Sequence, residues 1–232
     1  MDAADVQSHG DHPSPALRMR TPPVISNTFS LVALDPATGL LGSAVASRYF
    51  AVGAAVPHLR QGVGAFNTQS CHNHRLALQG LALMETGTDP QTAIGMVVAE
   101  DKQRQTRQLL ALDGRGRKGV WTGAECNAVA HHLLGETCVA AGNLLAGEAV
   151  VEAMVRAMDS ELDTPFGLRL IRALQAGERE GGDRRGKQSA AIVTVPATLN
   201  VWQSDYVDMR VDDSGDPLAD LVRLYEKRWS GQ

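Results

Sequence analysis

The stretch TFSLVALDPATGLLGSAVAS, residues 28–47, decides the fold of this chain. Residues 28–34 alternate in hydrophobicity and are partly β-branched, DPATG at residues 35–39 has the composition of a turn, and LLGSAVAS again favours a strand. Together they predict a β-hairpin. Two more extended runs, residues 51–58 and 62–69, are dense in small residues, as in strands that another backbone or a ligand approaches closely. Four short strands in succession predict an antiparallel sheet.

Helix pairs interrupt the strands in the rest of the chain. Apolar residues recur there at helical spacing, and DGRG at residues 113–116 is a strong hairpin turn. We expect helices over residues 74–86, 89–98, 148–160, 165–176 and 216–229, and strands over residues 107–112, 118–122, 188–195 and 206–211. Blocks of antiparallel strands separated by helix pairs exclude a doubly wound parallel sheet. They predict an α+β fold in which two packed sheets lie between layers of helices.

Composition and charge limit the domain count and the class of partner. A chain of 232 residues with 44% hydrophobic residues can bury one core, so we expect a single domain over residues 28–232. The formal net charge is −4, from 22 basic and 26 acidic residues without a block of one sign. This pattern argues against nucleic acid or an anionic membrane as partner, and leaves small molecules as the expected substrates.

The N-terminus and the cysteines indicate the compartment. The first 27 residues contain proline, histidine and acidic residues but no continuous apolar stretch. We therefore expect a disordered tail over residues 1–27, and neither a signal peptide nor a membrane span.

The 3 cysteines are odd in number and form no CxxC pair, which argues against a disulfide framework and favours a reducing cytoplasm.

Several motifs in order along the chain resemble a known family, the domains of unknown function called DUF1028, which are described as Ntn-hydrolase-like. The motifs are Thr-Phe-Ser at 28–30 with Asp35-Pro36, FAVG at 50–53, GNLL at 142–145, GGDRRGKQSA at 181–190, and the stretch from Val207 to Pro217. The resemblance covers residues 28–229. It implies the four-layer αββα sandwich of the N-terminal-nucleophile (Ntn) hydrolases, built from two mainly antiparallel sheets, and a homodimer.

The resemblance also implies a nucleophile. In Ntn hydrolases the hydroxyl or thiol of the first mature residue attacks an acyl carbon, and its own α-amine, which titrates near ~8, serves as the base. Thr28 is the residue that matches. Because 27 residues precede it, its amine is free only if the Asn27–Thr28 bond is cleaved or translation starts later. The alternative is that Thr28 is a β-branched residue that merely opens a buried strand.

The GGDRRGKQSA turn supplies three further candidates. An arginine, Arg184 or Arg185, could bind an acidic substrate with its guanidinium fork while Asp183 orients it. Adjacent residues in a strand-like segment point in opposite directions, so at most one of the two arginines is expected to face the site. The alternative is a charged turn that is simply solvated.

Four more residues complete the predicted site. Asn143 follows a glycine, and could donate its side-chain amide to a developing oxyanion or occupy a left-handed turn. Arg48, Gln69 and Asp208, each in or just after an expected strand, are candidates for substrate binding. The histidines and cysteines match no common zinc spacing, and the chain has no glycine-rich phosphate loop, so neither a metal nor a cofactor is expected.

Three functions remain open. The first is an amidohydrolase that uses Thr28 as a covalent nucleophile. The second is a hydrolytic deaminase that acts on an enamine or imine intermediate in the catabolism of an amino-aromatic or other nitrogenous compound, with water as nucleophile. Both hydrolyse a carbon–nitrogen bond other than a peptide bond in a small molecule that can be anionic. The third is a small-molecule-binding protein without catalysis.

Overall fold

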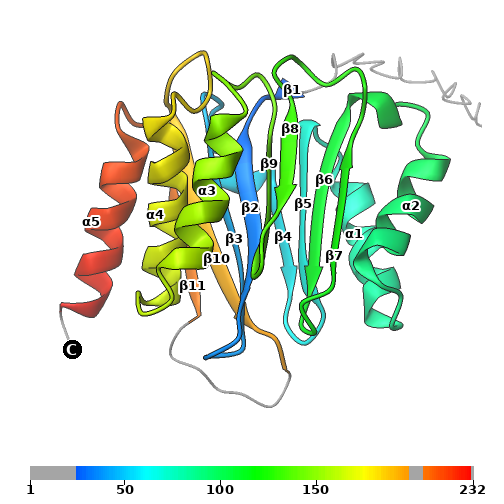
Figure 1. Cartoon of the computed structure of the whole chain (residues 1–232), viewed down its shortest axis with the longest axis horizontal. Coiled ribbons are helices and arrows are strands. Elements are labelled where there is room, and N and C mark those ends of the chain that lie inside the picture. Colours follow the sequence, from blue (N-terminus) through cyan, green and yellow to red (C-terminus); the bar gives the residue numbers. More distant parts are fainter. Residues whose placement is uncertain (1–24, 199–205, 231–232) are drawn as a thin grey trace, which may run out of the picture.

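The computed structural model describes residues 25–198 and 206–230. Two antiparallel sheets lie face to face, and helices cover the outer face of each (Figure 1). Helices α1 and α2 cover one sheet, and α3, α4 and α5 cover the other. This four-layer αββα sandwich confirms the α+β fold class that the sequence predicted and the resemblance implied.

The strands divide between a sheet A and a sheet B. Sheet A has the order β1-β5-β6-β7 with β4 also paired to β5, and consists of β1 (Ile25–Ser26), β4 (Pro57–Arg60), β5 (Gly64–Cys71), β6 (Arg107–Asp113) and β7 (Lys118–Thr122). Sheet B has the order β11-β10-β3-β2-β9-β8, and consists of β2 (Phe29–Asp35), β3 (Leu40–Ser47), β8 (His131–Leu134), β9 (Cys138–Gly142), β10 (Ser189–Pro196) and β11 (Val207–Val211).

Three of the five helices that the structure describes, α1, α2 and α5, begin at a residue whose side chain caps the first turn. The five helices are α1 (His74–Glu85), α2 (Pro90–Glu100), α3 (Ala149–Ser160), α4 (Phe166–Arg179) and α5 (Pro217–Trp229). The Asp89 side chain accepts a hydrogen bond from the Thr92 amide, and Asp216 accepts one from Ala219, each with proline as the next residue. Within residues 25–198 and 206–230, no helix is long and apolar enough to cross a membrane.

The β2–β3 hairpin sets the geometry of the later site. Asp35 accepts a hydrogen bond from the Thr38 hydroxyl in the turn, and Gly39 adopts the left-handed φ of 68° that an L side chain disfavours. In the resulting register, Phe29 pairs with Ala46. The start of β2 therefore lies beside the end of β3.

The layer between the two sheets changes from apolar to polar along the strands. At the end near the β2–β3 turn it contains the aliphatic residues Val32, Leu41, Ala65, Leu110, Leu112, Val139, Ala141 and Val195. At the other end lies a polar seam of buried side chains, namely Ser30, Ser43, Asn67, Gln69, Gln108 and Asn143. These side chains bond to one another. Burial of so many polar groups is costly, which indicates a role other than packing at this end.

The start of the domain and several strands differ from the prediction. Residues 1–24 of the predicted tail lie outside the described residues, but residues 25–27 belong to the fold, since β1 pairs with Ser70 and Cys71 on β5. Strands β8 and β9 lie in a stretch where we predicted no element, and β9 pairs with β2 in sheet B. Such short strands show too few alternations to be recognised from the sequence.

Of the residues before Thr28, the structure describes residues 25–27, and these add no side chain to the hydrophobic core. All members of the four hydrophobic clusters come from Phe29 or later positions. The contribution of β1 is limited to the edge of sheet A. A chain that begins at Thr28 therefore keeps every side chain of the core.

Candidate active site

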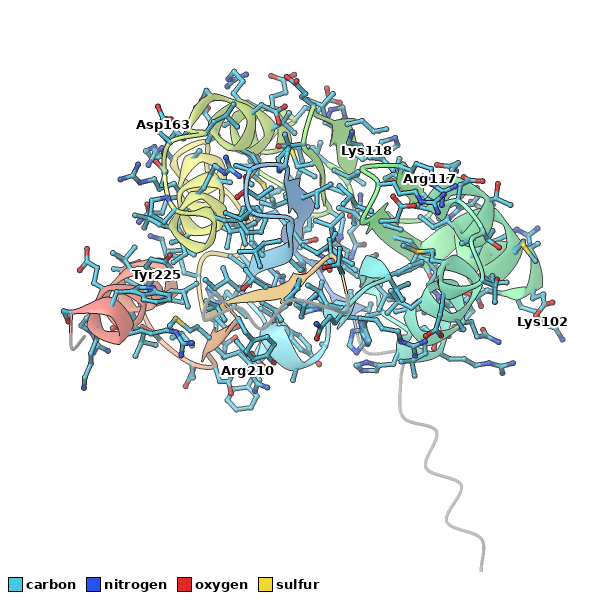
Figure 2. All side chains as sticks on the ribbon, turned by 90° about the horizontal axis from the view of Figure 1, so that it is seen from below. Lys102, Arg117, Lys118, Asp163, Arg210 and Tyr225 are labelled. Carbon is cyan, nitrogen blue, oxygen red and sulfur yellow. The ribbon has the colours of Figure 1, made fainter. Side chains whose placement is uncertain are left out.

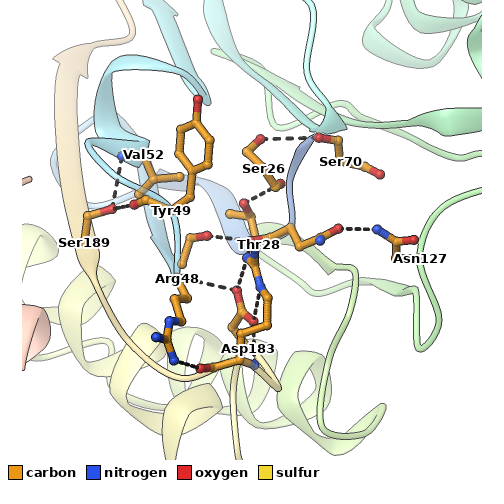
Figure 3. Close-up of polar contacts among 12 residues, drawn as sticks. Ser26, Thr28, Arg48, Tyr49, Val52, Ser70, Asn127, Asp183 and Ser189 are labelled. Atoms are coloured by element: carbon orange, nitrogen blue, oxygen red, sulfur yellow. Dashed lines mark hydrogen bonds and ion pairs between the residues drawn. The ribbon is translucent and has the colours of Figure 1, made fainter. Parts of the chain in front are cut away.

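Thr28 lies where β1 passes into β2, at the polar end of the layer between the sheets (Figure 3). Its side chain is fully buried, and its Oγ1 donates a hydrogen bond to the Ser26 carbonyl at 2.6 Å. The Thr28 carbonyl accepts a hydrogen bond from the backbone amide of Asn143 at 3.0 Å. The hydroxyl is thus fixed in place. The nitrogen, in contrast, is part of the peptide bond with Asn27, so the amine that an Ntn-type base requires is not free in this chain.

Two donors converge on the Asn27 carbonyl, which is the acyl group of the bond before Thr28. The Ser47 hydroxyl donates at 2.5 Å, and Arg185 Nη2 donates at 2.9 Å. Ser47 is the last residue of β3, and Arg185 lies in the turn before β10. Donors aimed at a carbonyl oxygen stabilise the negative charge that develops there during nucleophilic attack. The Asn27 carbonyl therefore occupies a position suited to an activated acyl group.

Asp183 holds Arg185 in position. Its buried carboxylate accepts bonds from Arg185 Nη2 at 2.6 Å, Arg185 Nε at 3.0 Å, and the backbone amides of Arg185 and Arg48 at 2.9 and 3.1 Å. This two-point pairing fixes the plane of the guanidinium group. Gly182 and Gly186 have left-handed φ angles of 51° and 105°, which allow the turn to fold back on itself.

The other two arginines of the predicted site lie outside it. Arg184 is exposed, and its backbone amide donates to the Leu144 carbonyl. Arg48 is also exposed, and its Nη1 donates to the Arg185 carbonyl at 2.5 Å (Figure 3). Of the two adjacent arginines, Arg185 alone reaches the acyl group, as the alternation argument expected for at most one of them.

The side chain of Asn143 has a free hydrogen-bond acceptor, whereas the predicted oxyanion role requires a free donor. Its Nδ2 donates to Gln108 Oε1 at 3.0 Å, so this donor is already used. Its buried Oδ1 has no partner among the described residues, so the atom left over is an acceptor. An oxyanion needs a donor, and this arrangement therefore does not support the predicted oxyanion role. A free acceptor on the segment that bonds to the Thr28 backbone suits an ammonium or amine group instead.

Gln69 and Asp208 do not line the site as predicted. Gln69 is fully buried in the polar seam and bonds to Ser30 and Gln108, so a substrate that enters from solvent cannot contact it. Asp208 is exposed on the outer strand β11, and β10 and β3 separate that strand from β2. Figure 2 shows its strand neighbour Arg210 at the surface of the molecule. Strand alternation predicts which face of its strand Asp208 lies on. It does not predict that this strand, β11, lies at the edge of sheet B.

Several residues near Thr28 were not predicted. Ser47 and Asn127 make hydrogen bonds to Asn27, and His72 Nδ1 lies 3.0 Å from Ser26 Oγ. The sequence did contain a signal for Ser47, because Ser43 and Ser47 are polar residues on the same face of an otherwise apolar strand. Asn127 lies in a loop without any periodic pattern, and only the folded structure brings it to the site.

The histidines and cysteines near the site are not arranged for metal chemistry. Among the residues that the structure describes, no group of three His, Cys, Asp or Glu side chains could hold a metal ion. Burial lowers the pKa of His58 to about 4 and also lowers the pKa of His72. Burial raises the pKa of Cys138 to about 12, so that thiol is no nucleophile at neutral pH.

Two cavities lie in different chemical surroundings. A small one of about 90 Å³ borders Ser47, Asp183 and Ser189, next to the groups that hold the Asn27 carbonyl. A larger one of about 580 Å³ is lined mainly by apolar residues of α4 and α5, including Phe166 and Trp229. A reactive site requires converging polar groups, so the small cavity is the better candidate of the two.

One solved structure is closely similar over most of the chain. Protein SPO2555 from Silicibacter pomeroyi, a DUF1028 protein, is 30% identical with a TM-score of 0.79, over 87% of this chain and 89% of that one. No curated protein matches.

Two proteins called Anbu share a weaker likeness. Anbu (ancestral beta-subunit) from Yersinia bercovieri is 14% identical with a TM-score of 0.44, over 88% of this chain and 95% of that one. Anbu from Hyphomicrobium sp. strain MC1 is 11% identical with a TM-score of 0.41, over 88% and 96%. At these TM-scores neither likeness carries an argument about this chain. The family of unknown function DUF1028 matches residues 28–221, and the chain belongs to that family.

Proposed function

We propose that this protein hydrolyses an amide carbon–nitrogen bond in a small molecule, with Thr28 as the nucleophile. One observation carries the proposal: the carbonyl before Thr28 is held by the Ser47 hydroxyl and by Arg185 Nη2. Asn27 stands there in the place of a substrate's acyl group. Thr28, a carbonyl that two donors hold, and a carboxylate that orients one of these donors lie together, which supports the proposal.

The reaction begins once the Asn27–Thr28 bond is broken. The neutral Thr28 amine, which titrates near ~8, takes the proton from Oγ1 as the oxygen attacks the acyl carbon. Ser47 and Arg185 stabilise the negative oxygen of the intermediate. The proton passes to the departing nitrogen, the carbon–nitrogen bond breaks, and an ester on Thr28 remains. Water then hydrolyses the ester to a carboxylic acid and restores the threonine.

In this scheme the Asn143 Oδ1, which has no partner among the described residues, accepts a hydrogen bond from the Thr28 amine. Asn143 and Thr28 are neighbours on adjacent segments, joined by the bond between the Asn143 amide and the Thr28 carbonyl. A buried acceptor without a donor is unfavourable in the uncleaved chain. A newly formed Thr28 amine on the adjacent segment would supply new donors. This role as amine holder replaces the oxyanion role predicted from the sequence.

The water-based deaminase is the weaker alternative. It requires the site to be open while residues 25–27 are still attached. In the structure these residues fill the position in front of Ser47 and Arg185. No specific contact favours the deaminase, so the amidohydrolase is the function that we propose.

Substitution of the nucleophile tests the proposal. The protein and its Thr28→Ala variant are incubated with a panel of amides, ureides and enamines, and release of amine or ammonia is followed. We expect hydrolysis by the native protein and by Thr28→Ser at a reduced rate, but none by Thr28→Ala. Arg184→Ala, at an exposed neighbouring position, serves as the control with unchanged activity. Full activity of Thr28→Ala would contradict a covalent role, and a ligand bound but recovered intact would indicate a binding protein.

A further inference from the structure

We propose that the site takes peptide-like amides whose acyl part is an extended chain ending in an asparagine-like residue. The chain's own residues 25–27 show the binding mode, with Asn27 next to the scissile position. The inference rests on the proposed function, because it names the acyl group of that same site. The contacts that select this group are the β1–β5 strand pairing and the hydrogen bond between Asn127 and Asn27.

The backbone of this segment lies on a free sheet edge. Strand β1 pairs antiparallel with Ser70 and Cys71 of β5, while β4 pairs with the preceding residues 64–67 of the same strand. Once residues 25–27 leave, the edge at Ser70 and Cys71 is open. An exposed edge of this kind accepts an extended peptide as an added strand, with affinity from main-chain hydrogen bonds.

The side chain of Asn27 is recognised by a matching amide. Asn127 Nδ2 donates to Asn27 Oδ1 at 2.9 Å, and Asn27 is buried. The loop that carries Asn127 is held in place because its carbonyl accepts a bond from the Leu144 amide. An apolar side chain at this position would leave the Asn127 amide without its partner. The contact therefore selects a carboxamide.

The position before it suits a small polar side chain. The Ser26 hydroxyl lies 3.0 Å from His72 Nδ1, and it donates a hydrogen bond to the Ser70 carbonyl at 3.4 Å. Tyr49 packs edge-on against the His72 ring, with 6.1 Å between the ring centroids. This enclosure leaves room for a hydroxymethyl group beside the imidazole ring.

The hydrolysis needs only water as co-reactant. Thr28 Oγ1 forms a bond to the carbonyl carbon of the asparagine-like residue, and the bond from that carbon to the leaving nitrogen breaks. The amine departs with the proton that came from Oγ1. Water then releases a peptide-like acid that ends in a free carboxylate.

Binding to a chain that begins at position 28 tests the selection without catalysis. This chain, with Thr28→Ala, is released from a cleavable N-terminal fusion and titrated calorimetrically with acetyl-Ile-Ser-Asn-amide and acetyl-Ile-Ser-Ala-amide. We expect the asparagine peptide to bind up to about tenfold more tightly, from one net hydrogen bond. In the additional Asn127→Ala variant the two peptides should bind equally. Equal binding to the chain that keeps Asn127 overturns the proposal.

A coumarinamide of the same peptide separates this inference from the proposed function. If the asparagine peptide binds preferentially but the Thr28 chain does not cleave its coumarinamide, the acyl assignment stands and the hydrolase proposal fails. If the Thr28 chain cleaves other amides without a preference for asparagine, the hydrolase stands and the acyl assignment is overturned.

A measurement on the full chain keeps the proposal testable even if the shortened chain does not fold. In the full-length Thr28→Ala background, amide hydrogen exchange of the β1–β5 pair is followed after Asn27→Ala, after Asn127→Ala and after both. We expect each single change to speed exchange by about two- to tenfold, and the double change to add nothing further. Independent effects, or none, overturn the role of this contact.

Discussion

Two aspartate–arginine pairs in this protein have the same chemistry but opposite placement. In the pair Asp35–Arg169 the atoms Nη2 and Oδ1 are 2.9 Å apart, and the arginine side chain is only 1% exposed. In the pair Asp183–Arg185 the atoms Nη2 and Oδ2 are 2.6 Å apart, the aspartate is 1% exposed and the arginine 33%. The first pair encloses both ions, whereas the second encloses the aspartate and leaves the arginine partly exposed.

The difference decides what the arginine can do. Arg169 lies over the Phe166 ring at 5.3 Å, and its remaining bond goes to the Leu162 carbonyl, so all its contacts are internal. Arg185 is anchored by a buried carboxylate, and its Nη2, which bonds to that carboxylate, also donates to the Asn27 carbonyl. A buried cation ties helix α4 to the sheet, whereas a buried anion presents a fixed cation outward.

The largest effect is expected on the internal pair. Arg169→Met leaves Asp35 buried without its counter-ion, so the free energy of unfolding should fall by about 3–5 kcal/mol. Urea denaturation measures this loss, and activity per folded molecule should be unchanged. Arg172→Met, on the same helix but with an exposed partner, should cost less than about 1 kcal/mol. Equal losses for the two variants would remove the distinction between an internal and a surface pair.

The second effect is on catalysis. Arg185→Met removes one of two donors to the acyl carbonyl, so kcat/KM for amide hydrolysis should fall by about 10²- to 10³-fold. The loss of stability should be smaller than for Arg169→Met, because backbone amides still bind Asp183. Arg185→Lys should not restore the rate, since lysine lacks the two-point fork. A rate that survives Arg185→Met would place the catalytic donor elsewhere.

A smaller effect is expected from the group that positions Arg185. Asp183→Asn keeps the shape but loses the charge, and hydrogen bonds to a charged group contribute about 1.5–3 kcal/mol. The rate constant kcat should therefore fall by about 10- to 100-fold with KM little changed. Steady-state kinetics separates the two parameters. A rise in KM alone would mean that Asp183 serves binding and not the orientation of the catalytic donor.

The smallest expected effect is a pH dependence of stability that comes from His58 and involves neither aspartate–arginine pair. Burial lowers the pKa of His58 to about 4 in the folded chain, below its ordinary 6.5, so the unfolded chain binds the proton more readily between these values. Stability should therefore be lost as the pH falls from about 6.5 toward 4. Because His58 is only partly buried, we expect about 1 kcal/mol between pH 7 and 5. His58→Gln should flatten this loss, which urea denaturation at each pH measures, whereas Arg169→Met should not.

The sequence predicted the architecture because its signals are local. The turn after Asp35 and the caps at Asp89 and Asp216 act within a few residues, and alternation limits the site to one of two adjacent arginines. The contacts of Asn127, and the use of the Asn143 donor by Gln108, depend on segments far apart in the chain. No local pattern encodes such long-range pairings, which is why these parts of the site were missed or misassigned.

The N-terminal residue of the purified, full-length chain tests the central claim most directly. If the carbonyl held by Ser47 and Arg185 marks the acyl position of a Thr28-dependent hydrolase, intact mass should show that the active protein begins at Thr28. The Thr28→Ala variant should retain the preceding residues. A fully active protein that still carries Asn27 bonded to Thr28 would contradict the account.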